Sequence, residues 1–90
     1  MDEFIERRRS DLAGRTANIL RELASDVNTE TVGRELHRIV GTCGSYGLVE
    51  GSQGAADLLA RVHDGHVLDL AGELITLAEV FARSVDGGDR

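Results

Sequence analysis

Apolar residues recur along this 90-residue chain at intervals of three and four, the spacing of α-helices that bury one face. The pattern predicts four helices: from about residue 2 to 24, from 28 or 29 to the glycine-rich segment at 44–47, from about 48 to 62, and from about 67 to 85. Their apolar positions are, in chain order, Phe4, Ile5, Leu12, Ala13, Ile19, Leu20, Leu23, Val32, Leu36, Ile39, Cys43, Leu48, Ala55, Leu58, Val62, Val67, Leu70, Leu74, Leu77, Phe81 and Val85.

Short polar or glycine-rich segments separate these stripes. Asn28 or Thr29 suits the N-cap of the second helix, and glycine near its end permits a left-handed C-terminal cap. The third connection is expected at 63–66, with Asp64 or His66 near the cap of the last helix. Helices joined by such short loops neighbour one another antiparallel. We therefore predict an all-α, up-down-up-down four-helix bundle over residues 1–85, followed by a flexible tail at 86–90.

The composition agrees with one small helical domain. With 41% hydrophobic residues and neither Pro nor Trp, the chain suits a single core built on Leu, Ile, Val and Ala. Sixteen acidic against ten basic residues give a net charge of −6, which argues against nucleic-acid binding. The single cysteine, Cys43, lies on an apolar stripe, so we expect a reduced and buried thiol.

The N-terminus carries no signal of export. Its first residues are acidic, and no apolar run of signal-peptide or membrane-spanning length follows. We expect a cytoplasmic protein, or a module of a larger cytoplasmic chain, without membrane association. Arg7, Arg8 and Arg9 interrupt the first stripe, and we interpret them as a solvated face, with a phosphate or partner contact as the alternative.

His37 has an unusual setting one residue off the apolar stripe of the second helix. Its neighbours one turn away on each side, at i−4 and i+4, are Gly33 and Gly41, and Gly44 follows in the same helix. Each glycine inside a helix costs roughly 0.5 to 1 kcal/mol relative to alanine, a loss that packing or function should offset. On helix pattern alone, a surface histidine of a structural bundle is the ordinary interpretation. The flanking glycines instead favour access for a broad partner.

The segment from Leu36 to Leu48 resembles the signature of histidine-containing phosphotransfer (HPt) domains. The shared features are a phosphorylatable His, a Gly four residues on, a small residue next, and an aromatic-Gly pair that ends the helix, here Tyr46-Gly47. The resemblance implies a four-helix bundle in which His37 carries a phosphoryl group within a two-component phosphorelay. By the same resemblance His37 would accept phosphate from a receiver aspartate or a kinase and pass it to another receiver.

Two positions differ from many family members. The residue three after His37, often Lys, is Val40, and the residue that often hydrogen-bonds the imidazole as Gln or Glu is Leu59. The family arrangement would bring Leu59 beside His37. Arg34 and Arg38 lie close to His37 in sequence and would offset phosphoryl charge, with an ordinary solvated helix face as their alternative.

The resemblance also implies the partners. We expect a receiver domain of a response regulator, a hybrid histidine kinase, or both, with Gly33, Gly41 and Gly44 letting the receiver close on His37. The sequence shows no acidic Mg²⁺ pocket and no Gly-rich nucleotide loop, so we expect a phosphocarrier without kinase activity of its own and without a cofactor. Mg²⁺ is expected on the receiver, and this chain is expected to be a monomer.

Two alternatives remain at this point. The first is a helical docking module that binds a receiver or kinase without carrying phosphate, which the residues at positions 40 and 59 favour. The second is a metal-binding or hydrolytic bundle that uses His37, His63 and His66. His-x-x-His without a Cys or Glu partner is typical of a polar loop, so we expect no metal site.

Overall fold

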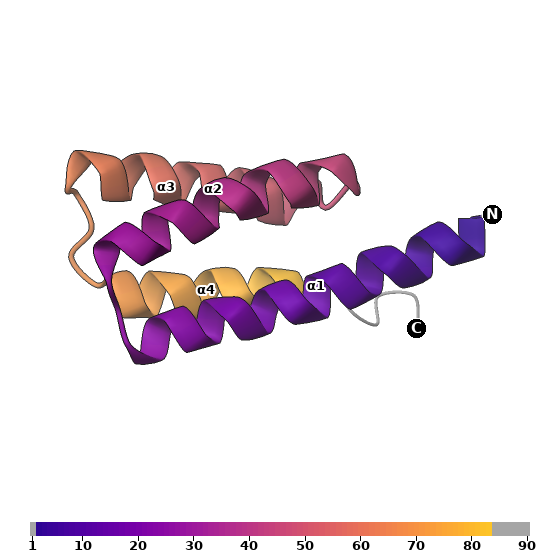
Figure 1. Cartoon of the computed structure of the whole chain (residues 1–90), viewed down its shortest axis with the longest axis horizontal. Coiled ribbons are helices and arrows are strands. Elements are labelled where there is room, and N and C mark those ends of the chain that lie inside the picture. The colour runs from indigo at the N-terminus through magenta and orange to yellow at the C-terminus, as the bar shows by residue number, and fades with distance from the viewer. Residues whose placement is uncertain (1, 84–90) are drawn as a thin grey trace.

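The computed structural model describes residues 2–83 of the chain, with side chains from residue 7 onward. These residues form four α-helices, α1 (Asp2–Ser25), α2 (Thr29–Ser45), α3 (Val49–Asp64) and α4 (Leu70–Ala82), and contain no strand (Figure 1). The predicted all-α class with four helices is confirmed. The predicted tail at 86–90 and the apolar position Val85 lie outside the described residues.

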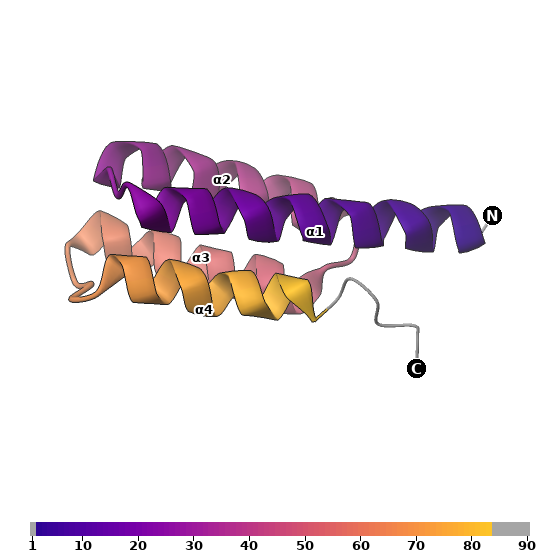
Figure 2. The same ribbon diagram turned by 90° about the horizontal axis from the view of Figure 1, so that it is seen from below.

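The four helices lie side by side along one long direction (Figures 1 and 2). The closest packing is between α1 and α4 and between α2 and α3, whereas α1 meets α2 and α3 meets α4 less extensively. The N-terminal turns of α1 extend past the other helices at one end of the molecule (Figure 1). The fold therefore consists of two tightly packed helix pairs around one core.

The core collects apolar side chains from all four helices, and most follow the predicted stripes. Its buried members are Ala13, Ala17, Leu20, Val32, Leu36, Ile39, Cys43, Leu48, Ala55, Leu58, Leu74, Leu77, Ala78 and Phe81. Burial of each large side chain contributes about 1.5 to 3 kcal/mol. The prediction that Ile19 belongs to the buried stripe of the first helix was wrong. Ile19 is 38% exposed, because the inward stripe of α1 runs through Ala13, Ala17 and Leu20.

The ends of α2 are defined by its caps. The Asn28 side chain accepts a hydrogen bond from the Thr31 backbone N–H at 3.1 Å, which confirms the predicted N-cap. At the other end Gly47 adopts a φ of 80°, and the N–H of Leu48 bonds to the carbonyl of Cys43 at 3.0 Å. This is a Schellman cap, and Leu48 is buried beside it.

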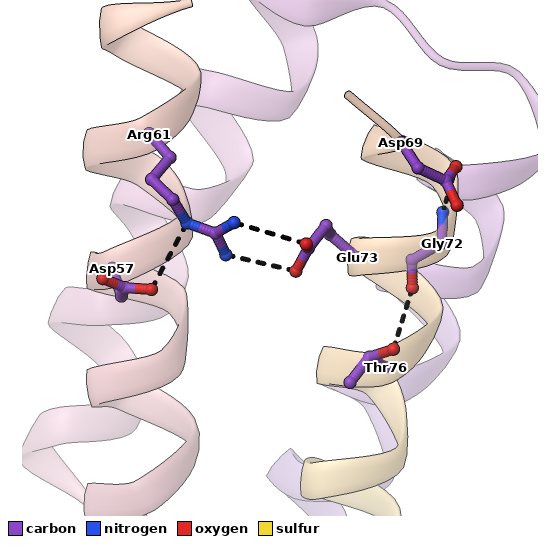
Figure 3. Close-up of polar contacts among 6 residues, drawn as sticks. All are labelled: Asp57, Arg61, Asp69, Gly72, Glu73 and Thr76. Atoms are coloured by element: carbon purple, nitrogen blue, oxygen red, sulfur yellow. Dashed lines mark hydrogen bonds and ion pairs between the residues drawn. The ribbon is translucent and has the colours of Figure 1, made fainter. Parts of the chain in front are cut away.

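The boundary between α3 and α4 differs from the prediction. Helix α3 continues two residues further, to Asp64, where Gly65 with a φ of 75° ends it, and α4 begins at Leu70 rather than near Val67. Asp69, not Asp64 or His66, is the N-cap of α4, and its carboxylate accepts the Gly72 N–H at 3.0 Å (Figure 3). The first residue of a helix is determined by the side chain that accepts a hydrogen bond from a free backbone N–H at the helix end. The spacing of apolar residues alone does not determine it.

An ion-pair cluster joins α3 to α4 (Figure 3). The guanidinium of Arg61 binds both carboxylate oxygens of Glu73, at 3.1 and 3.3 Å. Its Nε lies 3.4 Å from Asp57 Oδ2 as an ion pair, without hydrogen-bond geometry. The hydrogen bond from Arg61 holds the pKa of the Glu73 carboxyl below its usual value. The cluster is half-exposed, so its electrostatic attraction is screened by water.

The glycines of α3 meet α4 directly. A Cβ added at Gly51 would overlap the ring of Phe81, and one added at Gly54 would lie 2.8 Å from Leu77 Cδ1. Because such contacts are too close for real side chains, Phe81 and Leu77 of α4 can lie this near to α3 only where α3 has no side chain. These two glycines are therefore explained by internal packing.

Candidate functional site

A groove of about 900 Å³ runs between α2 and α3, on the face that carries His37. Helix α2 contributes Gly33, Arg34, His37 and Arg38, and α3 contributes Ala56, Leu59, Ala60 and His63. These positions follow the three- and four-residue spacing of one helical face, displaced by one residue from the buried stripe of each helix. The same periodicity that buries the core therefore presents this set to the groove.

His37 is exposed, and the helix surface on both sides of it is open. A Cβ added at Gly33 or at Gly41 would meet no atom of the described residues within 4 Å, apart from its own helix backbone and its chain neighbours. Neither glycine is thus required by packing within the protein. Gly44 is different, because a Cβ there would lie 3.4 Å from Ser52 Oγ, at the contact of α2 with α3.

The sequence-predicted residues are only partly brought together. Gly33, Arg34 and Arg38 line the groove with His37, while Gly41 and Gly44 are absent from its walls. Gly41 nevertheless borders His37 as its neighbour one turn on. Gly44 belongs to the contact of α2 with α3, so the structure gives it a packing environment of its own.

The two arginines have different surroundings. Arg34 is exposed, and no hydrogen bond or ion pair holds its side chain within residues 7–83. Arg38 lies 3.4 Å from Glu35, and 71% of its side chain is exposed. An exposed pair one turn apart on a helix contributes little and is readily exchanged for another anion. Both guanidinium groups can therefore turn toward a negative ligand in the groove.

The floor of the groove is apolar. Val40, Leu59 and Val62 are half-buried and pack against the core. Leu59 lines the same groove as His37, but its side chain accepts no hydrogen bond. Within the described residues nothing hydrogen-bonds the His37 imidazole, so both ring nitrogens are available to water or to a partner.

Sequence reasoning missed His63 as a member of this groove. It was assigned to a connecting turn, whereas it lies in the last turn of α3 and lines the groove with Asp64. The available signal was its position four residues after Leu59. His37, His63 and His66 do not gather into a metal site: the described residues contain no group of three His, Cys, Asp or Glu placed to hold an ion.

Two further residues discussed in the sequence analysis, Cys43 and Arg9, make contacts inside the protein. Cys43 is buried with its Sγ 3.8 Å from Thr16 Oγ1, and burial raises the pKa of its thiol. Arg9 is half-buried, and its Nε donates a hydrogen bond to the Tyr46 carbonyl at 2.9 Å. This bond ties α1 to the end of α2, so Arg9 is not simply part of a solvated face.

Comparisons with family models, curated proteins and solved structures found no match. None of the helices described for residues 2–83 has the length and apolar character needed to cross a membrane.

Proposed function

We propose that this chain is a histidine phosphotransfer protein of a two-component phosphorelay, with His37 as the phosphoryl carrier. The observation that carries the proposal is the exposed imidazole between two glycines over which the chain leaves open space. The resemblance of the segment from Leu36 to Leu48 to the HPt signature supports the same function. The proposed fold is an up-down-up-down bundle, supported by the lengthwise packing of α1 on α4 and of α2 on α3.

In the proposed reaction, a lone pair of a His37 ring nitrogen attacks the phosphorus of an aspartyl phosphate on a receiver domain. An N–P bond forms, the P–O bond to the aspartate breaks, and its electron pair leaves with the carboxylate. The other ring nitrogen keeps its proton, so the step requires no proton transfer. The reverse step returns the phosphoryl group to a receiver aspartate.

Arg34 and Arg38 are proposed to offset the charge of the transferred group. Both line the groove that contains His37, and guanidinium groups can form two parallel hydrogen bonds to phosphate oxygens. Phosphoryl transfer depends mainly on positioning and charge stabilisation, so the partner can supply the remaining groups. Those are the Mg²⁺ ion and the acidic pocket of the receiver.

The proposed chain is a phosphocarrier without kinase activity of its own. Its proposed partners are a response-regulator receiver domain, a hybrid histidine kinase, or both, and its proposed setting is the cytoplasm, as a monomer. The open surface at Gly33 and Gly41 supports close approach of such a partner to His37.

Intact-mass spectrometry tests the proposal. The wild-type chain and His37→Gln are each incubated with a phosphorylated receiver and Mg²⁺ at neutral pH. We expect one acid-labile phosphate on the wild type and none on His37→Gln, with His66→Gln, outside the groove, labelled like the wild type. Absence of phosphate on the wild type with each of several receivers, although they bind it, would contradict phosphotransfer.

The apolar floor of the groove favours a second candidate function. Val40 and Leu59 provide apolar surface instead of a lysine and a hydrogen-bond acceptor. A docking module that binds a receiver or a kinase without carrying phosphate needs only such a surface. This function predicts receiver binding that is unchanged in His37→Gln and no phosphate on either protein.

A further inference from the structure

A second imidazole, His63, faces the groove from the last turn of α3. It is exposed, and it lines the same groove as His37 and Arg34. The proposed transfer step does not use it. Its position without a hydrogen-bond partner, in the groove that holds the candidate carrier, makes it the strongest unassigned group among the described residues.

The two helices run side by side with a register set by one bond, from Ser52 Oγ to the Val40 carbonyl at 3.1 Å. Early residues of α2 and late residues of α3 line the groove together, so the helices run antiparallel there. At this register, His37 and His63 are separated along the groove by roughly 10 to 12 Å, at a rise of 1.5 Å per residue.

Helix geometry shortens the distance between the two imidazoles. Side chains on a helix tilt toward its N-terminus, so His37 tilts toward Thr29 and His63 tilts toward Val49. Because the helices are antiparallel, the two side chains converge over the same section of the groove. That section contains Gly33, above which the chain leaves empty space.

The geometry points to His63 as a second ligand of the phosphoryl group. We infer that its imidazole N–H donates a hydrogen bond to an oxygen of the phosphate on His37, opposite Arg34. The inference rests on the proposed function. Hydrogen bonds to an ionised acceptor such as phosphate are among the strong ones.

The groove carries charges of both signs. Arg34 and Arg38 add positive charge from α2, whereas Glu30 and Asp64 add negative charge at the end of the groove where His63 lies. A phosphoryl group over Gly33 would have hydrogen-bond donors on both helices. Among the described residues, none from α1 or α4 lines the groove.

The test is the equilibrium of phosphate between this chain and a receiver with Mg²⁺, measured by intact mass on both proteins. We compare the wild type with His63→Ala, His63→Arg and the matched control His66→Ala, whose histidine lies outside the groove. We expect His63→Ala to shift the equilibrium three- to tenfold toward the receiver, His63→Arg to restore it, and His66→Ala to leave it unchanged. Thermal unfolding should be the same for all four proteins.

The outcomes separate this inference from the proposed function. A wild type that takes up no phosphate contradicts the function itself, before any variant is compared. Phosphate on the wild type with an equal distribution in His63→Ala overturns the role of His63 alone. An equal shift in His66→Ala also overturns it, because the effect would then come from net charge and not from position.

Discussion

The open space at Gly41 makes an unusual prediction: one added methyl group should stabilise the protein and impair its function. In Gly41→Ala the new Cβ meets no atom from elsewhere in the chain within 4 Å, so the fold accepts it without strain. Removing the helix penalty of glycine should then stabilise the chain by about 0.5 to 1 kcal/mol. For a domain of this size, that raises Tm by roughly 2 to 8 °C.

The same methyl group occupies the surface that a receiver would approach. Displacing the reacting atoms by about 1 Å can reduce a transfer rate as much as 100-fold, so we expect at least a tenfold slower phosphotransfer from Gly41→Ala. Gly33→Ala should behave in the same way, since its surroundings are equally open. Calorimetry gives Tm, and rapid-quench kinetics with a phosphorylated receiver give the transfer rate.

Two control variants separate stability from steric exclusion. Thr42→Ala also improves helix propensity, but Thr42 is exposed toward α1 and not toward the groove, so it should raise Tm without slowing transfer. Gly51→Ala should instead destabilise the fold by about 1 to 3 kcal/mol, because its Cβ would overlap Phe81. Unchanged transfer in Gly41→Ala would refute the steric argument, and a lower Tm would refute the open surface.

Three further predictions each concern one side chain. Arg61 lowers the pKa of the Glu73 carboxyl, so the pair stabilises the fold at a pH above the usual carboxyl pKa of 4.5. This stabilisation is lost as the pH falls through the pKa that Glu73 has in the folded protein. The free energy of unfolding in urea, measured from pH 3 to 7, should therefore depend less on pH in Glu73→Gln than in the wild type. Asn28→Ala should cost about 1 kcal/mol in the same assay, and an unchanged midpoint would contradict the cap. Arg34→Ala should slow phosphotransfer three- to tenfold at low salt with Tm unchanged, and a rate insensitive to both salt and substitution would exclude a charge role.

Much of the fold was predictable because helix formation depends on local spacing. The buried residues of α2, namely Val32, Leu36, Ile39 and Cys43, are the predicted stripe without exception. The cap at Asn28 was predictable for the same reason, since its bond to Thr31 spans three residues. The start of α4 was not predictable from spacing, because Val67 also fits the apolar period. The helix begins only after Asp69, whose side chain caps it.

The site was only half predictable, because it needs the register of one helix against another. His37 and Arg34 share a face of α2, and the spacing within one helix places them together. His63 enters the groove only because α3 continues to Asp64 and because Ser52 sets its register against Val40. Neither fact follows from periodicity within a single segment.

The glycines show most clearly what the structure adds to the sequence. On helix propensity, Gly33, Gly41, Gly51 and Gly54 are equally unfavourable, and the sequence offers no way to tell them apart. The cost at Gly51 and Gly54 is offset within the chain, since side chains of α4 occupy the space. None of the residues that the structure describes occupies the space at Gly33 and Gly41. The proposed approach of a partner to His37 would give these two glycines a role that packing inside the protein does not give them.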